Sequence, residues 1–353
     1  MTHSFVLQPM RSRIVFGMGK TKEIAQETRR LGQRALIIST PGQSALAEMA
    51  ADLLGDLAVG IHAKAKMHVP VSVAQAGEAA AREVRADVLV ATGGGSTIGL
   101  AKAIALRLDL PILAVPTTYA GSEMTPIWGM TEGGMKRTGR DDRVLPATVL
   151  YDPALTYALP IHTSIVSGMN AIAHCVEALY SETANPLTTL MAEQGIAALG
   201  RALPVLREEP NNAGARSDAL YGAWLAGSVL GAVGMALHHK LCHTLGGTFN
   251  LPHAETHAIV LPHAFAYNRA AAPDASRRAA VALGVEDAPR ALFDMLGTLG
   301  APFALRDIGM PEAGLEDVVS LALTNPYYNP APLDADRLRA LLRNAWEGRP
   351  PEA

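Results

Sequence analysis

Six of the eleven histidines gather in two short parts of the chain, and they form the pattern most able to do chemistry. Asn170 and His174 are four residues apart, as are His239 and His243, so each pair shares one face of a helix. Three imidazoles with suitable geometry could bind zinc or iron. They could also act as general acids, since imidazole titrates near neutral pH. The six histidines are His174, His238, His239, His243, His253 and His257.

For any single histidine, a structural role in the core is the ordinary alternative. Repeated helical spacing is hard to attribute to packing, so it favours a function for the set. The HxxxH spacing is only moderately specific, and no carboxylate is obviously placed to complete a metal site. The residues alone therefore leave metal binding and acid–base chemistry both open.

A glycine-rich turn joins the apolar run at residues 88–91 to a helical stretch beginning near residue 96. Glycines let a backbone approach phosphate closely, and the next helix offers free N–H groups with a positive dipole end. The spacing is neither GxGxxG nor a Walker motif. A tight turn is the alternative, although three glycines exceed what a turn needs. The residues predicted to hold phosphate are Gly93, Gly94, Gly95 and Ser96.

A second polar loop follows the next apolar run, residues 111–116, and carries Thr117, Thr118 and Ser122. Hydroxyl groups after the carboxyl end of a parallel strand suit a ligand crevice in an open α/β sheet. Taken alone, this loop is as well explained as an ordinary capped loop. Two such loops on successive strands favour a nucleotide site.

The elements that must position these residues change in character along the chain. Apolar runs at 13–17, 34–39, 87–91 and 111–116 predict strands, and helical stretches at 21–31, 44–54, 71–85 and 96–108 separate them. This alternation indicates βαβ units and a parallel sheet. From residue 161 onward only helical patterns are convincing. We therefore predict a Rossmann-like α/β domain over residues 1–155 and an all-α domain over residues 156–353.

The charge and composition of the chain argue against some classes of partner and location. A formal net charge of −3 gives no reason to expect a nucleic-acid partner or an anionic membrane surface. Cys175 and Cys242 lie in apolar stretches without metal-binding spacing, which predicts buried free thiols in a reducing compartment. The uncharged stretch 219–237 contains four glycines and is expected to form a core helix rather than a membrane span. These features predict a cytoplasmic protein.

Five segments together resemble the iron-containing alcohol dehydrogenase superfamily, in its order and at its spacing. They read GGGSTIGLAKAIAL, PTTYAGSE, GMNAIAHCVEA, HHKLCHTLGG and LPHAETHAIVLPH. The resemblance covers nearly the whole chain. It implies a dehydroquinate synthase-like fold, a dinucleotide-binding domain followed by a helical one, a nicotinamide cofactor and, frequently, a homodimer.

The chain departs from the metal-dependent members of that superfamily at one position. Those members bind their metal with an Asp and three histidines, which correspond by position to His174, His239 and His253, while Asn170 occupies the Asp position. A neutral amide is a weaker ligand than a carboxylate. We therefore expect no metal, and these three histidines are the ligands if one binds. A further family histidine, one turn beyond a metal ligand, matches His243.

Asn170, with the stretches 324–330 and 136–146, resembles the maleylacetate reductases, a branch of the superfamily described as metal-independent. That resemblance implies reduction of the carbon–carbon double bond of maleylacetate to give 3-oxoadipate, late in the bacterial breakdown of aromatic compounds. The electron donor would be NADH or NADPH, and Lys136 is expected to contact it.

The expected chemistry agrees with the missing carboxylate. Reducing a ketone makes an alkoxide, which benefits from a Lewis-acid metal. Reducing an alkene conjugated to a ketone makes a less basic enolate, which hydrogen bonds from N–H groups can stabilise. We expect His243, or else His239, to donate the proton or polarise the carbonyl. The residues expected to line the dicarboxylate pocket are Asn170, His174, His253 and Tyr328.

Three rival functions remain distinguishable. A metal-dependent alcohol dehydrogenase or aldehyde reductase would contain stoichiometric iron or zinc that turnover requires. A lyase such as 3-dehydroquinate synthase needs a carboxylate-bound metal, and Asn170 argues against it. A cofactor-binding protein without activity is disfavoured by the intact glycine and histidine motifs.

Thr40 generates a prediction about the cofactor. Enzymes strict for NAD usually carry an Asp at the end of the second strand, where it bonds the ribose 2′-hydroxyl and repels a 2′-phosphate. The matching residue here, Thr40, is neutral, so NADH and NADPH should both be accepted. Steady-state kinetics should give comparable kcat/KM values for the two. A preference for NADH above roughly a hundredfold, about 3 kcal/mol, would contradict this.

Overall fold

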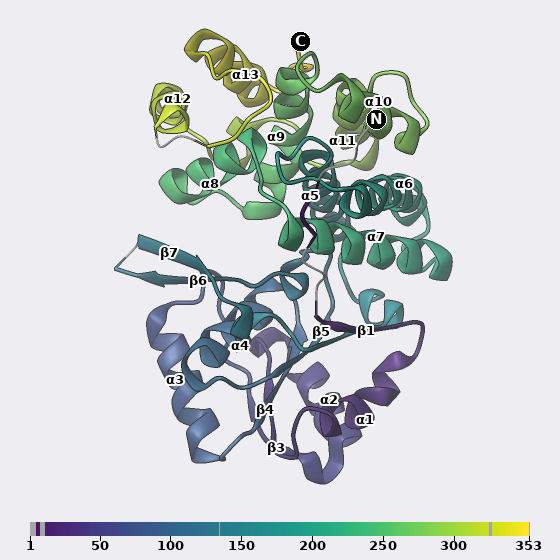
Figure 1. The fold of residues 1–353 in the computed structure, drawn as a ribbon, viewed down its shortest axis with the longest axis vertical. Coiled ribbons are helices and arrows are strands. Elements are labelled where there is room, and N and C mark those ends of the chain that lie inside the picture. The colour runs from purple at the N-terminus through teal and green to yellow at the C-terminus, as the bar shows by residue number, and fades with distance from the viewer. Residues whose placement is uncertain (1–4, 8–10, 134, 325–326, 353) are drawn as a thin grey trace. The chain divides into compact units, whose positions relative to one another are not determined.

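The computed structural model describes residues 5–7, 11–133, 135–324 and 327–352 (Figure 1). The chain divides into two compact units. The α/β unit is Pro9–Leu159, and the helical unit is Pro160–Ala353 together with Met1–Gln8.

A six-stranded parallel sheet forms the centre of the α/β unit. Its order is β1-β8-β5-β4-β2-β3, and each neighbouring pair is parallel. The inner strands are apolar and buried on both faces, as a sheet covered by helices requires. The strands are β1 (Arg13–Phe16), β2 (Ala35–Ile38), β3 (Ala58–His62), β4 (Val88–Gly93), β5 (Ile112–Pro116) and β8 (Thr148–Tyr151).

Four helices connect these strands: α1 (Ile24–Arg29), α2 (Ser44–Leu54), α3 (Val71–Glu83) and α4 (Gly95–Leu108). The β4–α4–β5 segment carries both polar loops singled out in the sequence, so both loops lie at the carboxyl ends of neighbouring strands. This is where ligands bind in open α/β sheets. The predicted parallel α/β sheet is confirmed.

Sequence patterns missed four strands, and three of them were missed for a physical reason. β3 is an edge strand, partly exposed and interrupted by Gly60. β8 is four residues long and buried, as β2 is, and nothing in the structure explains why its pattern was missed. The antiparallel hairpin of β6 (Ile127–Glu132) and β7 (Met135–Arg140) is largely exposed, so cross-strand pairing rather than a hydrophobic pattern forms it.

The described part of the helical unit contains helices and no strand, as predicted (Figure 1). α5 lies at its centre, where residues 164–178 are all buried, and it packs against α6, α7 and α9. The helices are α5 (Ile161–Leu179), α6 (Pro186–Glu208), α7 (Ala213–Ala232), α8 (Leu237–Phe249), α9 (His253–Asn268), α10 (Pro273–Leu283), α11 (Ala288–Leu299), α12 (Leu315–Leu323) and α13 (Ala335–Glu347).

The stretch 219–237 is not the single core helix that the sequence predicted. α7 ends at Ala232, Val233 is extended, and α8 begins at Leu237 at an angle of 94° to α7. The new helix can start there because the buried Glu177 carboxylate accepts the backbone N–H groups of Ala236 and His238. Among the described helices none alone is long and apolar enough to cross a membrane, and this bent pair passes only by length and composition.

Both cysteines are buried free thiols, as predicted. Cys175 faces the helical core from α5, and Cys242 lies in α8. Burial raises the pKa of each thiol, so both remain protonated at neutral pH.

Candidate functional site

The glycine loop has a geometry that only glycine can adopt. Gly93 ends β4 with φ of +147°, and a Cβ there would lie 2.6 Å from both Gln43 Oε1 and Thr97 Oγ1. A Cβ on Gly94 would lie 2.9 Å from Thr118 Cγ2. Gly94 precedes α4 in extended conformation, so the first turn of α4, which contains Gly95 and Ser96, begins directly at the loop. Backbone and helix end together form a cradle suited to phosphate.

The Gln43 side chain, which the sequence analysis missed, links predicted cofactor residues that follow different strands. Gln43 Nε2 donates to Thr117 Oγ1 at 3.2 Å, and Thr40 Oγ1 donates to Gln43 Oε1 at 3.3 Å. The Thr117 N–H also donates to the Gly93 carbonyl at 3.2 Å. Thr40, Gly93 and Thr117 therefore gather at the carboxyl ends of β2, β4 and β5. The available signal was the position of Gln43, three residues after Thr40.

A buried lysine fixes the end of the second loop. Lys102 on α4 is fully buried, and its Nζ donates to the Ser122 carbonyl at 2.6 Å and to the Thr125 carbonyl at 2.7 Å. Burial lowers the pKa of Lys102 to about 7. The helix that follows the glycine loop thereby holds the loop that carries Ser122. Lys136 lies in β7, and its side chain is outside the described part of the structure.

In the helical unit, α5, α8 and α9 bring the predicted histidines into one cluster around His257. The His257 ring centroid lies 4.2 Å from that of His253, 5.1 Å from that of His239 and 6.5 Å from those of His174 and His243. The rings of His174 and His239 are 5.2 Å apart. Spacing of four along each helix places these side chains on one face, as the sequence indicated.

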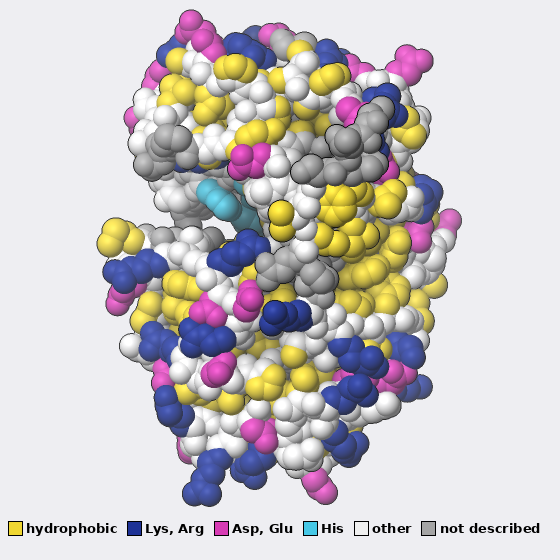
Figure 2. All heavy atoms as spheres, viewed as in Figure 1, with side chains coloured by type: hydrophobic (Ala, Val, Ile, Leu, Met, Phe, Trp, Pro, Cys, Tyr) yellow, Lys and Arg dark blue, Asp and Glu magenta, His cyan; other side chains and the backbone are white. Residues whose placement is uncertain are grey.

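The cluster runs from the surface into the core. Asn170, His174 and His239 are 3%, 2% and 6% exposed, whereas His243 and His253 are exposed. Histidine side chains reach the surface on the face drawn in Figure 2. A ligand would meet the exposed imidazoles first and the buried ones behind them.

Burial sets the charge of the inner rings. It lowers the pKa of His174, His238 and His257 well below the usual value, and neighbouring imidazoles lower it further. These rings are neutral at pH 7, so each offers one N–H donor and one lone pair.

Glu177 is the buried carboxylate that sequence analysis did not find. Its Oε2 lies 2.6 Å from His239 Nδ1, and its two oxygens accept the backbone N–H groups of Ala236 and His238 at 2.9 and 2.8 Å. Glu177 thus orients His239 from behind and is already engaged by three partners. Its position seven residues after Asn170, on the same face of α5, was the signal that could have found it.

Five buried polar atoms in or beside the cluster have no hydrogen-bond partner within the described residues: Asn170 Oδ1, His174 Nδ1, His238 Nδ1, His239 Nε2 and His257 Nε2. Buried polar atoms are rarely left unsatisfied in folded proteins. Three of the five belong to Asn170, His174 and His239, which the sequence assigned to the site. This pattern is typical of a pocket that a polar ligand completes.

The donor set is weaker for a divalent metal than one that includes a carboxylate ligand. Asn170 supplies a neutral amide, and the Glu177 carboxylate is committed to His239 and the backbone. Among the described residues, one group of His, Cys, Asp or Glu has ligand atoms within 4.8 Å of one another, and it is not the trio His174, His239 and His253.

That group is His238, Cys242 and His257, whose members bond to each other. His238 Nε2 lies 3.0 Å from His257 Nδ1, and the Cys242 sulfur lies 3.7 Å from His238 Nε2. The Cys242 thiol is held protonated by burial, which raises its pKa. We interpret this trio as a hydrogen-bonded support behind the cluster.

Tyr328, the last predicted pocket residue, follows α12 and is 38% exposed. Asn325 and Pro326, from the same predicted stretch, lie outside the described residues. In that stretch, Asn329 exchanges side-chain hydrogen bonds with Asn268 on α9 at 2.9 and 2.7 Å. Closure of the pocket by Tyr328 stays a prediction.

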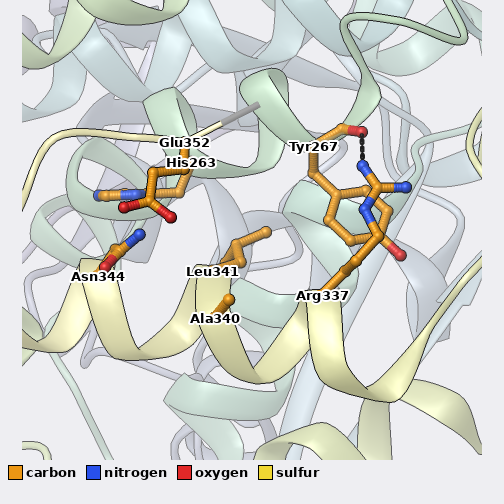
Figure 3. Close-up of a pocket in the computed structure, with 7 residues that line it drawn as sticks. All are labelled: His263, Tyr267, Arg337, Ala340, Leu341, Asn344 and Glu352. Carbon is orange, nitrogen blue, oxygen red and sulfur yellow. Dashed lines mark hydrogen bonds between the residues drawn. The ribbon is translucent and has the colours of Figure 1, made fainter.

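Apart from the histidine cluster, a small hollow lies between α9 and α13 (Figure 3). Its volume of about 80 Å³ is far below the roughly 300–1,000 Å³ of typical ligand sites. Burial lowers the pKa of its His263 to about 4, and the Arg337 guanidinium donates to the Tyr267 carbonyl. Because of its size, we place neither a dinucleotide nor a dicarboxylate there.

Comparison with known proteins gives matches over nearly the whole chain. Residues 11–153 match the iron-containing alcohol dehydrogenase model, and residues 164–346 match the model of the C-terminal part of that family. The maleylacetate reductase of Sphingobium indicum is 55% identical over 98% of this chain and 99% of its own length.

Solved structures agree. The chain superposes on the maleylacetate reductase of Agrobacterium tumefaciens with a TM-score of 0.96 and 49% identity, covering 99% of this chain and 100% of that one. The corresponding enzyme of Rhizobium sp. strain MTP-10005 gives a TM-score of 0.95 and 49% identity, with the same coverage.

The Glu177 contacts generate a stability prediction. In Glu177→Gln, one oxygen must replace two that accept three hydrogen bonds, so we expect unfolding free energy to fall by about 1.5–3 kcal/mol. Urea denaturation followed by circular dichroism measures this. We also expect the ring-nitrogen NMR signals of His239 to shift. Glu182→Gln, at an exposed position, should change neither. An unchanged urea midpoint together with unchanged His239 signals would contradict the assigned role.

Proposed function

This chain belongs to the iron-containing alcohol dehydrogenase family and is an oxidoreductase, and we propose that it reduces the carbon–carbon double bond of maleylacetate to give 3-oxoadipate. The observation that carries this proposal is the donor set of the cluster. A neutral Asn170 and neutral buried imidazoles surround the space where metal-dependent relatives hold a carboxylate-bound ion. Relatives that share more than half of the sequence bear the name of this activity.

Maleylacetate carries two carboxylates, and the cluster suits such a substrate. The Asn170 side chain, whose Oδ1 has no partner among the described residues, and the His174 ring lie at the buried end, and neither carries a negative charge. Exposed His253 stands at the entrance, and its ring lies against that of His257. N–H groups of these residues can donate to carboxylate oxygens without competing with a ligand carboxylate.

We propose that His239 and His243 donate the proton and stabilise the negative charge that develops on the substrate. Glu177 occupies Nδ1 of His239 and leaves Nε2 for the substrate. His243 is exposed, 6.0 Å from His239 between ring centroids, and can exchange protons with solvent. Reduced nicotinamide, when bound, supplies a hydride. An enolate oxygen formed in the substrate would be stabilised by an N–H donor from this pair, and one of the two imidazoles would protonate the product.

We propose that the cofactor is NADH or NADPH, held by the α/β unit. The glycine cradle at residues 93–96 would accept the pyrophosphate, and Thr40, Thr117, Thr118 and Ser122 would contact the rest of the dinucleotide. The fixed geometry of Gly93 and the ties through Gln43 and Lys102 support this assignment. Lys136 remains a proposed contact from sequence resemblance alone.

We further propose that the enzyme is a cytoplasmic homodimer with no nucleic-acid or membrane partner. Family resemblance supports the dimer. Two buried free thiols support a reducing compartment, and the small net charge gives no electrostatic reason for a polyanionic partner.

We propose, on the basis of the donor set, that turnover needs no metal, and this is directly testable. NADH oxidation with freshly prepared maleylacetate should proceed at the same rate, within twofold, before and after exhaustive treatment with EDTA. Because position 170 holds a neutral amide and Glu177 is engaged by His239, we expect chelation to remove nothing that turnover needs.

A metal-dependent relative assayed in parallel should lose activity and thereby show that chelation is complete. Loss of activity in this enzyme that added iron or zinc restores would contradict metal independence. It would then make His174, His239 and His253 the ligands to examine. Absence of NADH oxidation under every condition would contradict the substrate instead.

A further inference from the structure

The carboxyl end of β3 places two lysines beside the proposed ribose-binding residue Thr40. β2 and β3 pair in parallel up to Ile38 and His62. Beyond that pair the Ser39 N–H donates to the His62 carbonyl at 3.3 Å, and the Ala65 N–H donates to the Ser39 carbonyl at 3.0 Å. Residues 63 and 64 therefore run alongside Ser39, and Thr40 is the next residue of the neighbouring strand.

Lys64 and Lys66 are exposed at this edge, while Ala65 between them is buried. The backbone is thus fixed against β2 and both ammonium groups extend into solvent. None of the ion pairs or hydrogen bonds found among the described residues involves either ammonium group. Two cations without an acidic partner are available for a ligand.

His62, the last residue of β3, lies at the same edge of the sheet, and its side chain is buried. Its Nε2 has no hydrogen-bond partner within the described residues. Burial and then the charge of Lys64 lower the pKa of His62, so the Lys64 ammonium lies near this ring. The positive charge of Lys64 thus acts at this edge, where it favours an anion.

The surrounding loops contain no carboxylate that could neutralise the lysines. Residues 39–44, 62–70 and 92–97, which follow β2, β3 and β4, include no Asp or Glu. An enzyme strict for NAD places a carboxylate here to repel a 2′-phosphate, whereas a basic residue accommodates that phosphate. The local charge has the sign that suits a phosphomonoester dianion.

We propose that Lys64 and Lys66 bind the 2′-phosphate of NADPH beside Thr40 and so determine how well this enzyme accepts NADPH. This inference rests on the dinucleotide part of the proposed function and does not depend on the substrate. The neutral Thr40 merely fails to repel a 2′-phosphate, whereas the two lysines would attract it.

The test is a binding titration without substrate, followed by the fluorescence of the reduced nicotinamide. In the double variant Lys64→Ala/Lys66→Ala we expect the Kd for NADPH to rise at least tenfold, while the Kd for NADH changes less than twofold. Adenosine 2′,5′-bisphosphate should compete with NADPH on the wild type and lose most of its competition on the double variant, whereas 5′-AMP should behave alike on both.

The matched control is Lys20→Ala/Lys22→Ala. It removes two positive charges after β1, at the opposite edge of the same sheet. It should leave both Kd values within twofold, which separates local binding from the net charge of the enzyme.

Three results would overturn the proposal: an NADPH Kd that stays within twofold in the Lys64/Lys66 variant, equal weakening of NADH and NADPH, or a wild type that binds NADPH over a hundredfold more weakly than NADH. Normal NADPH binding combined with no turnover of maleylacetate would instead count against the proposed substrate.

Discussion

The site depends on a single buried carboxylate. Glu177 accepts two backbone N–H groups where α8 begins and lies 2.6 Å from His239 Nδ1. An isolated buried charge is costly, and these three hydrogen bonds offset that cost. The same contacts start α8 after the bend, set the orientation of His239 and keep the carboxylate away from any ligand. The chemistry available to the cluster is therefore that of neutral N–H donors and one oriented imidazole.

This constraint gives Asn170 its central place in the proposed function. With Glu177 engaged, position 170 is where a carboxylate ligand would have to enter, and an amide stands there instead. Neutral rings at His174, His238 and His257 then leave a pocket that can accept negative charge. An enolate is less demanding than an alkoxide, so a pocket of this kind matches conjugate reduction better than ketone reduction.

Much of the fold was predictable because its signals are local. Buried runs such as residues 88–91, helical spacing of His239 and His243, and the glycine loop all follow from short-range patterns. Contacts that join distant segments were not predictable. Glu177 reaches α8 across about sixty residues, Gln43 ties Thr40 to Thr117, and the exposed hairpin β6–β7 has no hydrophobic alternation to reveal it. The bend at residues 233–236 belongs to the same class, since its stabilising partner lies on α5.

The most direct test of the central claim is the KM for maleylacetate of Asn170→Asp in buffer containing EDTA. A carboxylate at this position would repel a dianionic substrate and remove an amide N–H donor from the pocket. The account predicts a KM at least tenfold above that of the wild type, equivalent to about 1.4 kcal/mol. A KM within twofold of the wild type would contradict the claim that a neutral residue at position 170 makes this cluster a dicarboxylate site.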